Sequence, residues 1–452
     1  MEQKFNLFKT EPKHTYNIKK EDYEDIHLTT SSAQNINAAT GNLDFEVNST
    51  DAYFDMTEAH ILAKITVTQA ADKNITLENN FFPRLFSQMV LRLNGNSFQT
   101  IDDPYFVDSI LKYITLPKDF SETEGSITGW FPDTHSGNIV NKLSVSNPAT
   151  NDELTAIVNR LNLEKVNTGF QYRKKYFTPK AGADDAGKNV FSIKYPLKTI
   201  FSFLNHEAYS TQFKWSLRLT KDINLGRLFH GAAGSTNADV TLTINDIRLR
   251  IPKITPSIHI EPMLLKQISS DKIAKAITLD RHIKSITLDQ ATVRYNWEIS
   301  RLMNNPRYLF VVFQDTTAAD DILQNNSKFV SYKDGTNYIK NLQLHIDNVR
   351  YPVEPIIVHD GTERNKYDAY DLYVKMCNSF GNICPMDIDD FNNLSSIFCF
   401  DLSASEELLK KNGINVKLII EKALFPCRVY ALYLEDNIYS LNYKTGMITS
   451  EL

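Results

Sequence analysis

The chain has 452 residues, of which 42% are apolar and 11% aromatic, enough to fill two or three hydrophobic cores of ordinary size. Its 49 basic and 54 acidic residues give a net charge of −5, which argues against a protein that binds polyanions over its whole surface. The four cysteines lie in the last quarter of the chain and form no CxxC pair, so we expect buried thiols rather than a disulfide framework.

The N-terminal segment, residues 1–44, is predicted to be an extended arm, because it is polar and has weak hydrophobic periodicity. Its first 25 residues contain five lysines and six acidic residues, so it is not a basic arm that would neutralise packaged nucleic acid. The start of the chain has no apolar core of a signal peptide. No apolar run approaches the ~20 residues of a membrane span. We therefore expect neither secretion nor a membrane span.

From Leu43 onward, apolar and polar residues alternate with period two over many short stretches, which is typical of half-buried β-strands. Turn residues separate these stretches, and this arrangement favours antiparallel β-sandwiches. The clearest predicted strands are Ile61–Val67, Val90–Leu93, Lys214–Thr220, Val240–Ile251, Asn341–Ile346 and Val416–Glu421.

Three segments have helical patterns instead. Asp103–Thr115 has a proline in its first turn, where the missing N–H costs no hydrogen bond, and Lys366–Cys377 is also rich in aromatic residues. Asp152–Lys165 is predicted to be an amphipathic helix that Asn151 or Asp152 caps. The apolar face of this helix would consist of Leu154, Ile157, Val158 and Leu161.

The same kinds of block recur in the same order in the two halves of the chain, which indicates that one β-sandwich was duplicated. The offsets between partners drift because the connecting loops differ in length. The paired blocks are Ile65–Gln69 with Phe310–Gln314, Leu91–Phe98 with Leu342–Val349, Asp103–Thr115 with Lys366–Cys377, Ile193–Leu197 with Phe398–Leu402, Trp215–Leu219 with Val416–Ile420, and Leu242–Asp246 with Leu432–Asp436.

The duplication predicts two tandem sandwiches, the first over residues 45–252 and the second over residues 253–452. The first half has a much longer connection between its aromatic helix and its next strand than the second half. A long insertion is tolerated only in a loop, because it would break the core of a sandwich. Residues 116–190 are therefore expected to form a compact tower at one end of the first sandwich.

Several motifs suggest chemistry, but each has a more ordinary interpretation. Gly182–Asn189 (GADDAGKN) has the spacing of a phosphate loop, yet Asn189 replaces the metal-binding Ser or Thr and a strand follows, so we expect a turn. The acidic run Met386–Phe391 (MDIDDF) lacks the alternating ligands and the glycine of a calcium loop, so we expect a solvated loop. Gln171–Phe177 (QYRKKYF) could bind single-stranded nucleic acid, but a lysine-protected edge strand is more ordinary.

The histidines are scattered and form no HxH or HExxH pattern, no GxSxG motif is present, and His359–Asp360 is an isolated pair that we expect in a loop. The sequence therefore identifies no catalytic, cofactor-binding or metal-binding residue. The protein is predicted not to be an enzyme and to use no cofactor.

The run Glu78–Phe98 (ENNFFPRLFSQMVLRLNGNSF) resembles the major capsid proteins of Polinton (Maverick) elements and the related adintoviruses. That family has a similar Asn-Asn-aromatic step, a Leu-Phe-Ser-Gln step and a strand that ends in an Asn-Gly turn. The resemblance is specific over residues 45–115 and looser over 190–255, and in the second half it rests on strand order. Further similar segments are Phe5–Pro12, Tyr53–Ile65, Lys214–Arg227 and Val240–Ile254.

The resemblance implies an all-β double jelly roll, two tandem eight-stranded jelly-roll β-sandwiches with few short helices in loops. It implies a major capsid protein whose homotrimers form pseudo-hexameric capsomers and tile an icosahedral shell around a DNA genome. The partners would be other copies of the chain, penton proteins and minor capsid proteins, in a virion capsid assembled inside the host cell. No sequence-specific contact with nucleic acid is implied.

Two other classes of protein stay open. A β-sandwich carbohydrate-binding or adhesion module is the first alternative, although such proteins are usually secreted. A jelly-roll enzyme that acts on sugars is the second, and it would need a cleft with paired carboxylates. The size of the protein in solution separates these classes, because a capsid protein forms trimers or larger assemblies.

Overall fold

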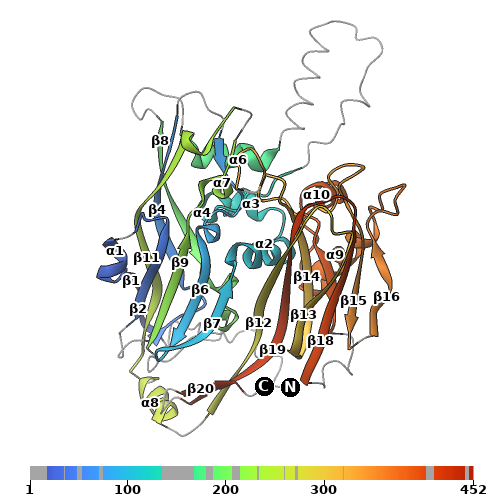
Figure 1. The fold of residues 1–452 in the computed structure, drawn as a ribbon. Helices are drawn as coiled ribbons and strands as arrows, with labels where there is room; N and C mark the ends of the chain where they lie inside the picture. Colours follow the sequence, from blue (N-terminus) through green and yellow to red (C-terminus); the bar gives the residue numbers. More distant parts are fainter. Residues whose placement is uncertain are drawn as a thin grey trace, which may run out of the picture.

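The structure is a computed structural model. It describes residues 18–34, 36–47, 53–70, 75–134, 167–179, 187–205, 214–231, 234–258, 260–269, 273–318, 320–347, 349–403, 412–442 and 447–450. Two β-sandwiches stand side by side with their strand axes similarly oriented, and helix α2 (Pro104–Thr115) lies between them (Figure 1).

The first sandwich contains eight main strands in two antiparallel sheets. These strands are β1 (Ile18–His27), β2 (Thr40–Val47), β4 (His60–Gln69), β6 (Phe86–Leu93), β7 (Asn96–Asp102), β8 (Lys188–Pro196), β9 (Trp215–Asp222) and β11 (Val240–Pro256). One sheet has the order β1-β11-β4-β8 and the other the order β2-β9-β6-β7. Three short strands complete this half, namely β3 (Tyr53–Phe54), which pairs with β11, and β5 (Ile75–Leu77), which pairs with β10 (Phe229–Gly231).

The second sandwich repeats this plan. Its main strands are β12 (Ile273–Leu288), β13 (Arg294–Asn304), β14 (Pro306–Asp315), β15 (Ile339–Ile346), β16 (Val349–Ile357), β17 (Phe398–Asp401), β18 (Asn412–Lys422) and β19 (Cys427–Asn442). The sheet orders are β12-β19-β14-β17 and β13-β18-β15-β16, and β20 (Met447–Ser450) pairs with β19.

The two sandwiches have the same jelly-roll topology. Numbered in chain order within each half, the strands follow the orders 1-8-3-6 and 2-7-4-5 in both. The predicted double jelly roll is therefore confirmed. The partners of all six repeated blocks occupy equivalent elements: β4 and β14, the β6–β7 and β15–β16 hairpins, α2 and α9 (Asp368–Ser379), β8 and β17, β9 and β18, and β11 and β19.

The alternation that predicted these strands corresponds to burial. In β18, Ile414, Val416, Leu418 and Ile420 are all buried, and the residues between them are partly exposed. The Asn94–Gly95 turn of the β6–β7 hairpin has positive φ at both positions, a conformation that Asn and Gly adopt at low cost.

The expected N-terminal arm over residues 1–44 is wrong for the described part of that segment. Strand β1 pairs with β11 from Ile18↔Pro256 to His27↔Arg248, and β2 pairs with β9 from Thr40 onward. Charged contacts between the strands, rather than an apolar face, attach β1 to β11. Asp25 accepts hydrogen bonds from Arg250 at 2.6 and 2.8 Å and from Arg248 at 3.0 Å. Hydrophobic periodicity therefore could not reveal this strand. Residues 1–17 lie outside the described residues.

The helices lie mostly at the ends of the sandwiches and between them. Besides α2 and α9, which confirm the two predicted aromatic helices, they are α1 (Thr30–Gln34), α3 (Phe120–Thr123), α4 (Gly125–Thr128), α6 (Thr168–Phe177), α7 (Leu225–Leu228), α8 (Glu261–Ser269) and α10 (Ile388–Asn393). Helix α8 lies in the connection between the two sandwiches. Within the described ranges, no helix is long and apolar enough to cross a membrane.

The tower expected over residues 116–190 differs from the structure where the chain is described. Trp130, Phe131 and Phe177 are buried in the same core as the strands, and the rings of Phe81 and Phe177 meet edge to face with centroids 5.7 Å apart. The predicted helix Asp152–Lys165 and its apolar cluster lie outside the described residues. The flanks of the insertion are thus part of the first sandwich.

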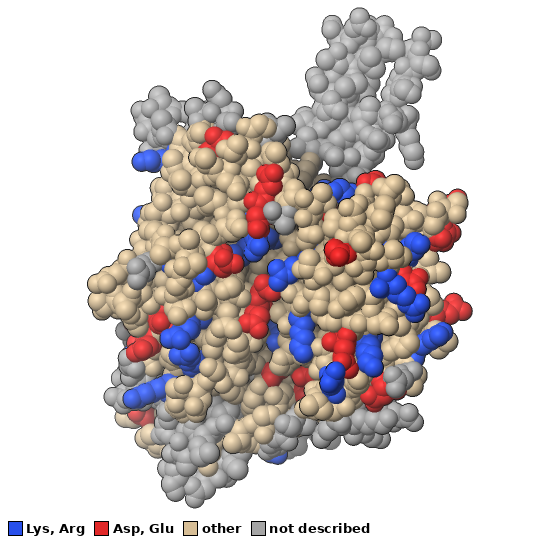
Figure 2. Space-filling model, viewed as in Figure 1, with Lys and Arg blue, Asp and Glu red and all other residues tan. Residues whose placement is uncertain are grey.

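The surface in view carries mixed charge. Figure 2 shows lysine and arginine side chains interspersed with aspartate and glutamate over both sandwiches, without a large region of one sign. This distribution agrees with the small net charge of −5.

Candidate assembly site at the junction of the two sandwiches

A buried acid fixes the end of the first sandwich to a loop of the second. Glu78 is 0% exposed, and its carboxylate accepts a hydrogen bond from the backbone N–H of Asn326 at 2.7 Å and another from the hydroxyl of Ser327. The Ser327 oxygen accepts in turn from the backbone N–H of Asn79 at 3.1 Å. Arg84 donates to the Asn326 carbonyl at 2.8 Å. A buried carboxylate costs free energy unless it is hydrogen-bonded, so these contacts define how the two halves meet.

Asn80 connects the same segment to α2. Its backbone is left-handed, with φ of 56°, a region that asparagine tolerates better than most residues. Its side-chain amide donates to Asp108 at 2.9 Å, and its carbonyl oxygen accepts from Lys112 at 2.9 Å. Lys112 and Asp108 form an ion pair of 2.7 Å whose side chains are only 3% and 0% exposed. Asn80, Asp108 and Lys112 are thus joined in the interior by hydrogen bonds and an ion pair, while one carboxylate oxygen of Asp108 has no hydrogen-bond partner among the described residues.

Arg173 of α6 is a second buried centre. Its guanidinium donates to the carbonyl of Leu77 at 2.9 Å, to the carbonyl of Phe131, and to a carboxylate oxygen of Asp133 at 2.7 Å. The other oxygen of Asp133 accepts from Asn325 of the second sandwich at 2.7 Å. Burial alone would raise the pKa of Asp133, but the charge of Arg173 and the hydrogen bonds from its neighbours outweigh burial and lower this pKa. The carboxylate is therefore ionised at the boundary.

Asp280 of β12 forms the corresponding contact lower in the junction. It accepts hydrogen bonds from Gln99 of β7 at 2.8 Å, from Ser202 at 2.8 Å and from Asn437 at 2.9 Å, and also from Tyr439. Burial would raise the pKa of Asp280, but these hydrogen bonds keep it below its usual value. One carboxylate thus joins an edge strand of the first sandwich to two strands of the second.

Aromatic and helix contacts fill the space between these polar centres. The rings of Phe106 in α2 and Tyr430 in β19 stack with centroids 3.5 Å apart. The Tyr373 hydroxyl of α9 donates to the carbonyl of Tyr113 at 2.5 Å. The side chain of Asn382 donates to two carbonyls near the end of α2. The junction is therefore a packed core with buried charges, and its chemistry suits rigid positioning rather than catalysis.

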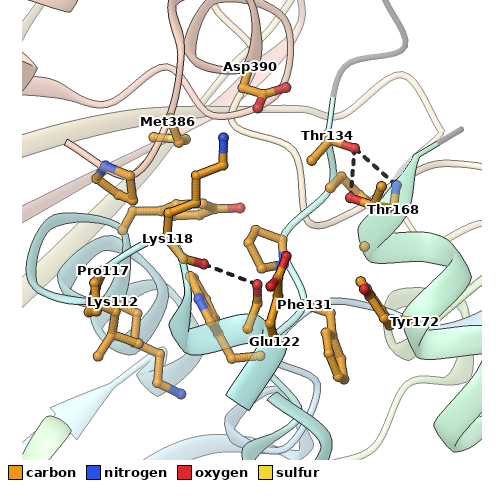
Figure 3. A pocket seen from close by; sticks show the side chains of 18 residues that line it. Lys112, Pro117, Lys118, Glu122, Phe131, Thr134, Thr168, Tyr172, Met386 and Asp390 are labelled. Carbon is orange, nitrogen blue, oxygen red and sulfur yellow. Dashed lines mark hydrogen bonds between the residues drawn. The ribbon is translucent and has the colours of Figure 1, made fainter. Parts of the chain in front are cut away.

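A pocket of about 140 Å³ opens beside this core, lined by Lys118, Glu122, Phe131, Tyr172 and Met386 among others (Figure 3). Its hydrogen bonds join neighbouring loops: Ser121 donates to the carbonyl of Lys118 at 3.2 Å, and the hydroxyls of Thr134 and Thr168 lie 3.1 Å apart. These contacts activate no nucleophile. Within the described ranges, no group of three or more His, Cys, Asp or Glu side chains could hold a metal ion.

The structure places the other candidate motifs in structural roles. Of the GADDAGKN motif, residues 182–186 lie outside the described residues, and β8 starts directly after Gly187, so a strand follows as expected. The basic-aromatic segment Gln171–Phe177 is not an edge strand but part of α6, because Arg173 and Phe177 recur at helical spacing on its buried face. His359 stacks on the ring of Tyr338 at 4.0 Å and accepts a hydrogen bond from the Gly361 backbone at 3.0 Å.

The acidic run Met386–Phe391 is not a solvated loop. Asp387 is the N-cap of α10, and its carboxylate accepts from the backbone N–H of Asp390 at 2.8 Å. Aspartate is a preferred residue at this position because it satisfies an N–H that the helix leaves free. The run therefore starts a helix, and Asp390 is buried.

A repeated Asn-Asn pair in the sequence marks both sides of the junction. Asn79-Asn80 of the first half has a counterpart in Asn325-Asn326 of the second half, at an offset of 246 residues. This offset agrees with the 245 and 251 residues that separate the neighbouring repeated blocks. The two Asn-Asn segments meet at Glu78 and Ser327, so the repeat would have identified both sides of the contact.

Comparison with known proteins agrees with this architecture. The family model for a double jelly roll-like domain matches residues 179–438. A chain of the cryo-EM structure of the Sputnik virophage matches with a TM-score of 0.63 at 11% identity, over 96% of this chain and 89% of that one. The major capsid protein of mavirus matches with a TM-score of 0.60 at 12% identity, over 95% and 90% of the two chains.

The major capsid protein of Faustovirus gives a TM-score of 0.56 at 9% identity, over 93% of this chain and 90% of that one. No curated protein matches the sequence. Because the family model spans more than half of the residues and the sheets repeat one jelly-roll topology, the chain belongs to the double jelly roll-like domain family.

Proposed function

We propose that the chain is a major capsid protein whose homotrimers form pseudo-hexameric capsomers of an icosahedral shell around a DNA genome. The observation that carries this proposal is the junction, which holds two jelly rolls of one topology side by side through buried charges. The structural likeness to viral major capsid proteins supports the same role. Two like wedges in each chain allow three chains to close a ring of six.

The contact within the chain suggests the contact between chains. Inside the chain, β7 of the first sandwich faces β12 and β19 of the second, through Gln99 with Asp280 and through Phe98 with Tyr439, whose ring centroids are 4.4 Å apart. Repeating this relation around a ring would place β16, the equivalent of β7, against β1 and β11 of the next copy. Strand β16 has an unusually apolar exposed surface: Val353 is 80% exposed and Val349 69%.

Light scattering on purified protein tests this proposal. We expect a mass three times that of the 51.7 kDa chain. Val353→Asp and Tyr23→Asp, which alter exposed residues on β16 and β1, should each yield folded monomers because a charge would face the partner. Val190→Asp, an exposed position on β8, is the matched control and should remain trimeric. A wild-type protein that stays monomeric at high concentration contradicts the capsid role, and a trimeric Val353→Asp contradicts only the proposed surface.

Several finer proposals accompany this function. The segment Glu78–Phe98 supports a capsid protein of the Polinton or adintovirus type. Penton and minor capsid proteins would be further partners in a virion capsid assembled inside the host cell, with no catalytic activity and no sequence-specific contact with nucleic acid. The insertion within residues 116–190 would face the particle exterior. The alternative, a carbohydrate-binding or adhesion module, predicts no obligatory trimer. The light-scattering mass therefore distinguishes it from a capsid protein.

A further inference from the structure

Two cysteines of the second sandwich lie close together where the chain turns back along α9. Cys377 is buried in the last turn of this helix, and Cys384 is partly exposed on the segment that follows. The backbone N–H of Asn382 donates to the carbonyl of Cys377 at 3.0 Å, and Gly381 has φ of 73°. Such a left-handed residue after a helix reverses the chain direction. The reversal brings residue 384 back beside the helix that carries residue 377.

The surroundings of Cys384 make it the more reactive thiol of the two. Its sulfur lies 3.2 Å from the carbonyl of Met386 and 4.0 Å from the hydroxyl of Tyr370 on the same helix. A hydrogen bond from Cys377 lowers the pKa of Cys384 to about 7, although burial opposes this effect. The same hydrogen bond, together with burial, raises the pKa of Cys377. Because the thiolate is the nucleophile, Cys384 can react near neutral pH while Cys377 remains a thiol beside it.

We propose that Cys377 and Cys384 form an intramolecular disulfide by exchange with a low-molecular-mass disulfide such as oxidised glutathione. In the first step the Cys384 thiolate attacks one glutathione sulfur, and the other glutathione leaves as a thiolate. In the second step Cys377 loses its proton to solvent and attacks the Cys384 sulfur, and the second glutathione leaves. Two protein thiols are oxidised and one glutathione disulfide is reduced to two thiols, so the electrons balance.

The new bond would act on the junction. Asn382 lies between the two cysteines, and its side chain donates to the carbonyl of Ile114 at 3.0 Å and to the carbonyl of Leu116 at 2.9 Å. Closing the turn therefore fixes a contact through which the second sandwich holds α2 of the first. On the proposed capsid function, this would stabilise the particle after it leaves the reducing interior of a cell.

Thiol counting on the full chain tests the disulfide directly. Reduced protein is incubated with oxidised glutathione under native conditions, then denatured and alkylated. We expect the four free thiols of the sequence to fall to two, with Cys377 and Cys384 linked in a peptide digest. Cys399→Ala removes a buried cysteine of β17 and is the matched control, which should fall from three thiols to one. Cys377→Ala should stop at a glutathione adduct on Cys384, because the second step has lost its thiol. The adduct should form more slowly than in the wild type, because the variant also loses the hydrogen bond that lowers the pKa of Cys384.

Two results overturn the proposal. Either all four thiols survive in the native wild-type protein, or the wild type accumulates a glutathione adduct on Cys384 that never converts to the internal bond. If Cys377→Ala does not fold, Cys384→Ala gives the same test: its three remaining thiols should survive glutathione treatment, and their loss contradicts the assignment. The readout is independent of oligomeric state, so failure here is distinguishable from failure of the proposed capsid function.

Discussion

Replacing Arg173 with methionine is expected to destabilise the protein strongly, because it leaves a buried carboxylate without its cation. The guanidinium donates to Asp133 at 2.7 Å and also satisfies the carbonyls of Leu77 and Phe131. Methionine fills a similar volume but donates no hydrogen bond. Removing one partner of a buried ion pair costs about 3–5 kcal/mol of unfolding free energy. The change should appear in urea unfolding monitored by the fluorescence of the nearby, buried Trp130.

Lys174→Met is the matched control, since it removes the same charge from the next position of α6, where the side chain is exposed. Its effect should stay within about 0.5 kcal/mol. The double variant Arg173→Met with Asp133→Asn should regain part of the loss, because it removes the uncompensated charge. A cost below about 1 kcal/mol for Arg173→Met would show that the ion pair does not hold the junction.

The pH dependence gives a second test of the same reasoning. In the wild type the pKa of Asp133 is lowered, so the stability it contributes is present above 3.8 and is lost as the pH falls through its folded value. Without Arg173, burial raises the pKa of Asp133. The variant should therefore gain stability as the pH falls from 7 toward 3.8, the pKa of this side chain in the unfolded chain. The difference between wild type and variant should therefore shrink at pH 5. A difference that is independent of pH contradicts the assignment to Asp133.

Three further outcomes are expected. Burial raises the pKa of Glu435 from 4.5 to about 7, so its contribution to the free energy of unfolding is fully present below pH 4.5 and is lost as the pH rises through 7. Glu435→Gln removes this loss. The variant should therefore gain stability over the wild type at pH 8 but not at pH 5, by up to about 3 kcal/mol, in thermal melts at the two pH values. Replacing residues 135–166 with a short Gly-Ser linker should leave cooperative thermal unfolding intact, because the hydroxyls of Thr134 and Thr168 already hold the two ends together, whereas replacing 116–190 should abolish folding through loss of Trp130 and Phe177. Asp280→Ala should lower the unfolding free energy by about 2–4 kcal/mol, because Gln99 and its other donors lose their acceptor, while Asp289→Ala, at an exposed turn, should change it little.

The sequence predicted those parts of the fold that depend on local periodicity. The alternation in β4, β9 and β18 reflects burial on one face, and all three strands were predicted near their observed bounds. Strand β1 was missed because its own residues (IKKEDYEDIH) do not alternate between apolar and polar, and its pairing depends on the contacts of Asp25 with Arg248 and Arg250. The edge strand predicted over 171–177 is wrong because Arg173 and Phe177 recur at helical spacing, and burial of that face favours a helix.

The junction could not be derived from local patterns. Glu78 and Asn326 are 248 residues apart, and either one alone looks like an ordinary loop residue. Only the placement of the two sandwiches gives each buried group its partner. The repeated Asn-Asn pair is the nearest local signal, because Asn79-Asn80 lies in the segment Glu78–Phe98 and duplication of the fold implies a second copy, which is Asn325-Asn326.

The connection from β11 through α8 to β12 makes the two jelly rolls one covalent body. Any contact between tethered modules forms at a high effective concentration and does not depend on how much protein is present. In a ring of six wedges built from three chains, three of the six contacts would therefore form during folding, and only the other three would respond to dilution. Because the two kinds of contact use different residues, mutations could weaken the second kind for disassembly while leaving the first intact.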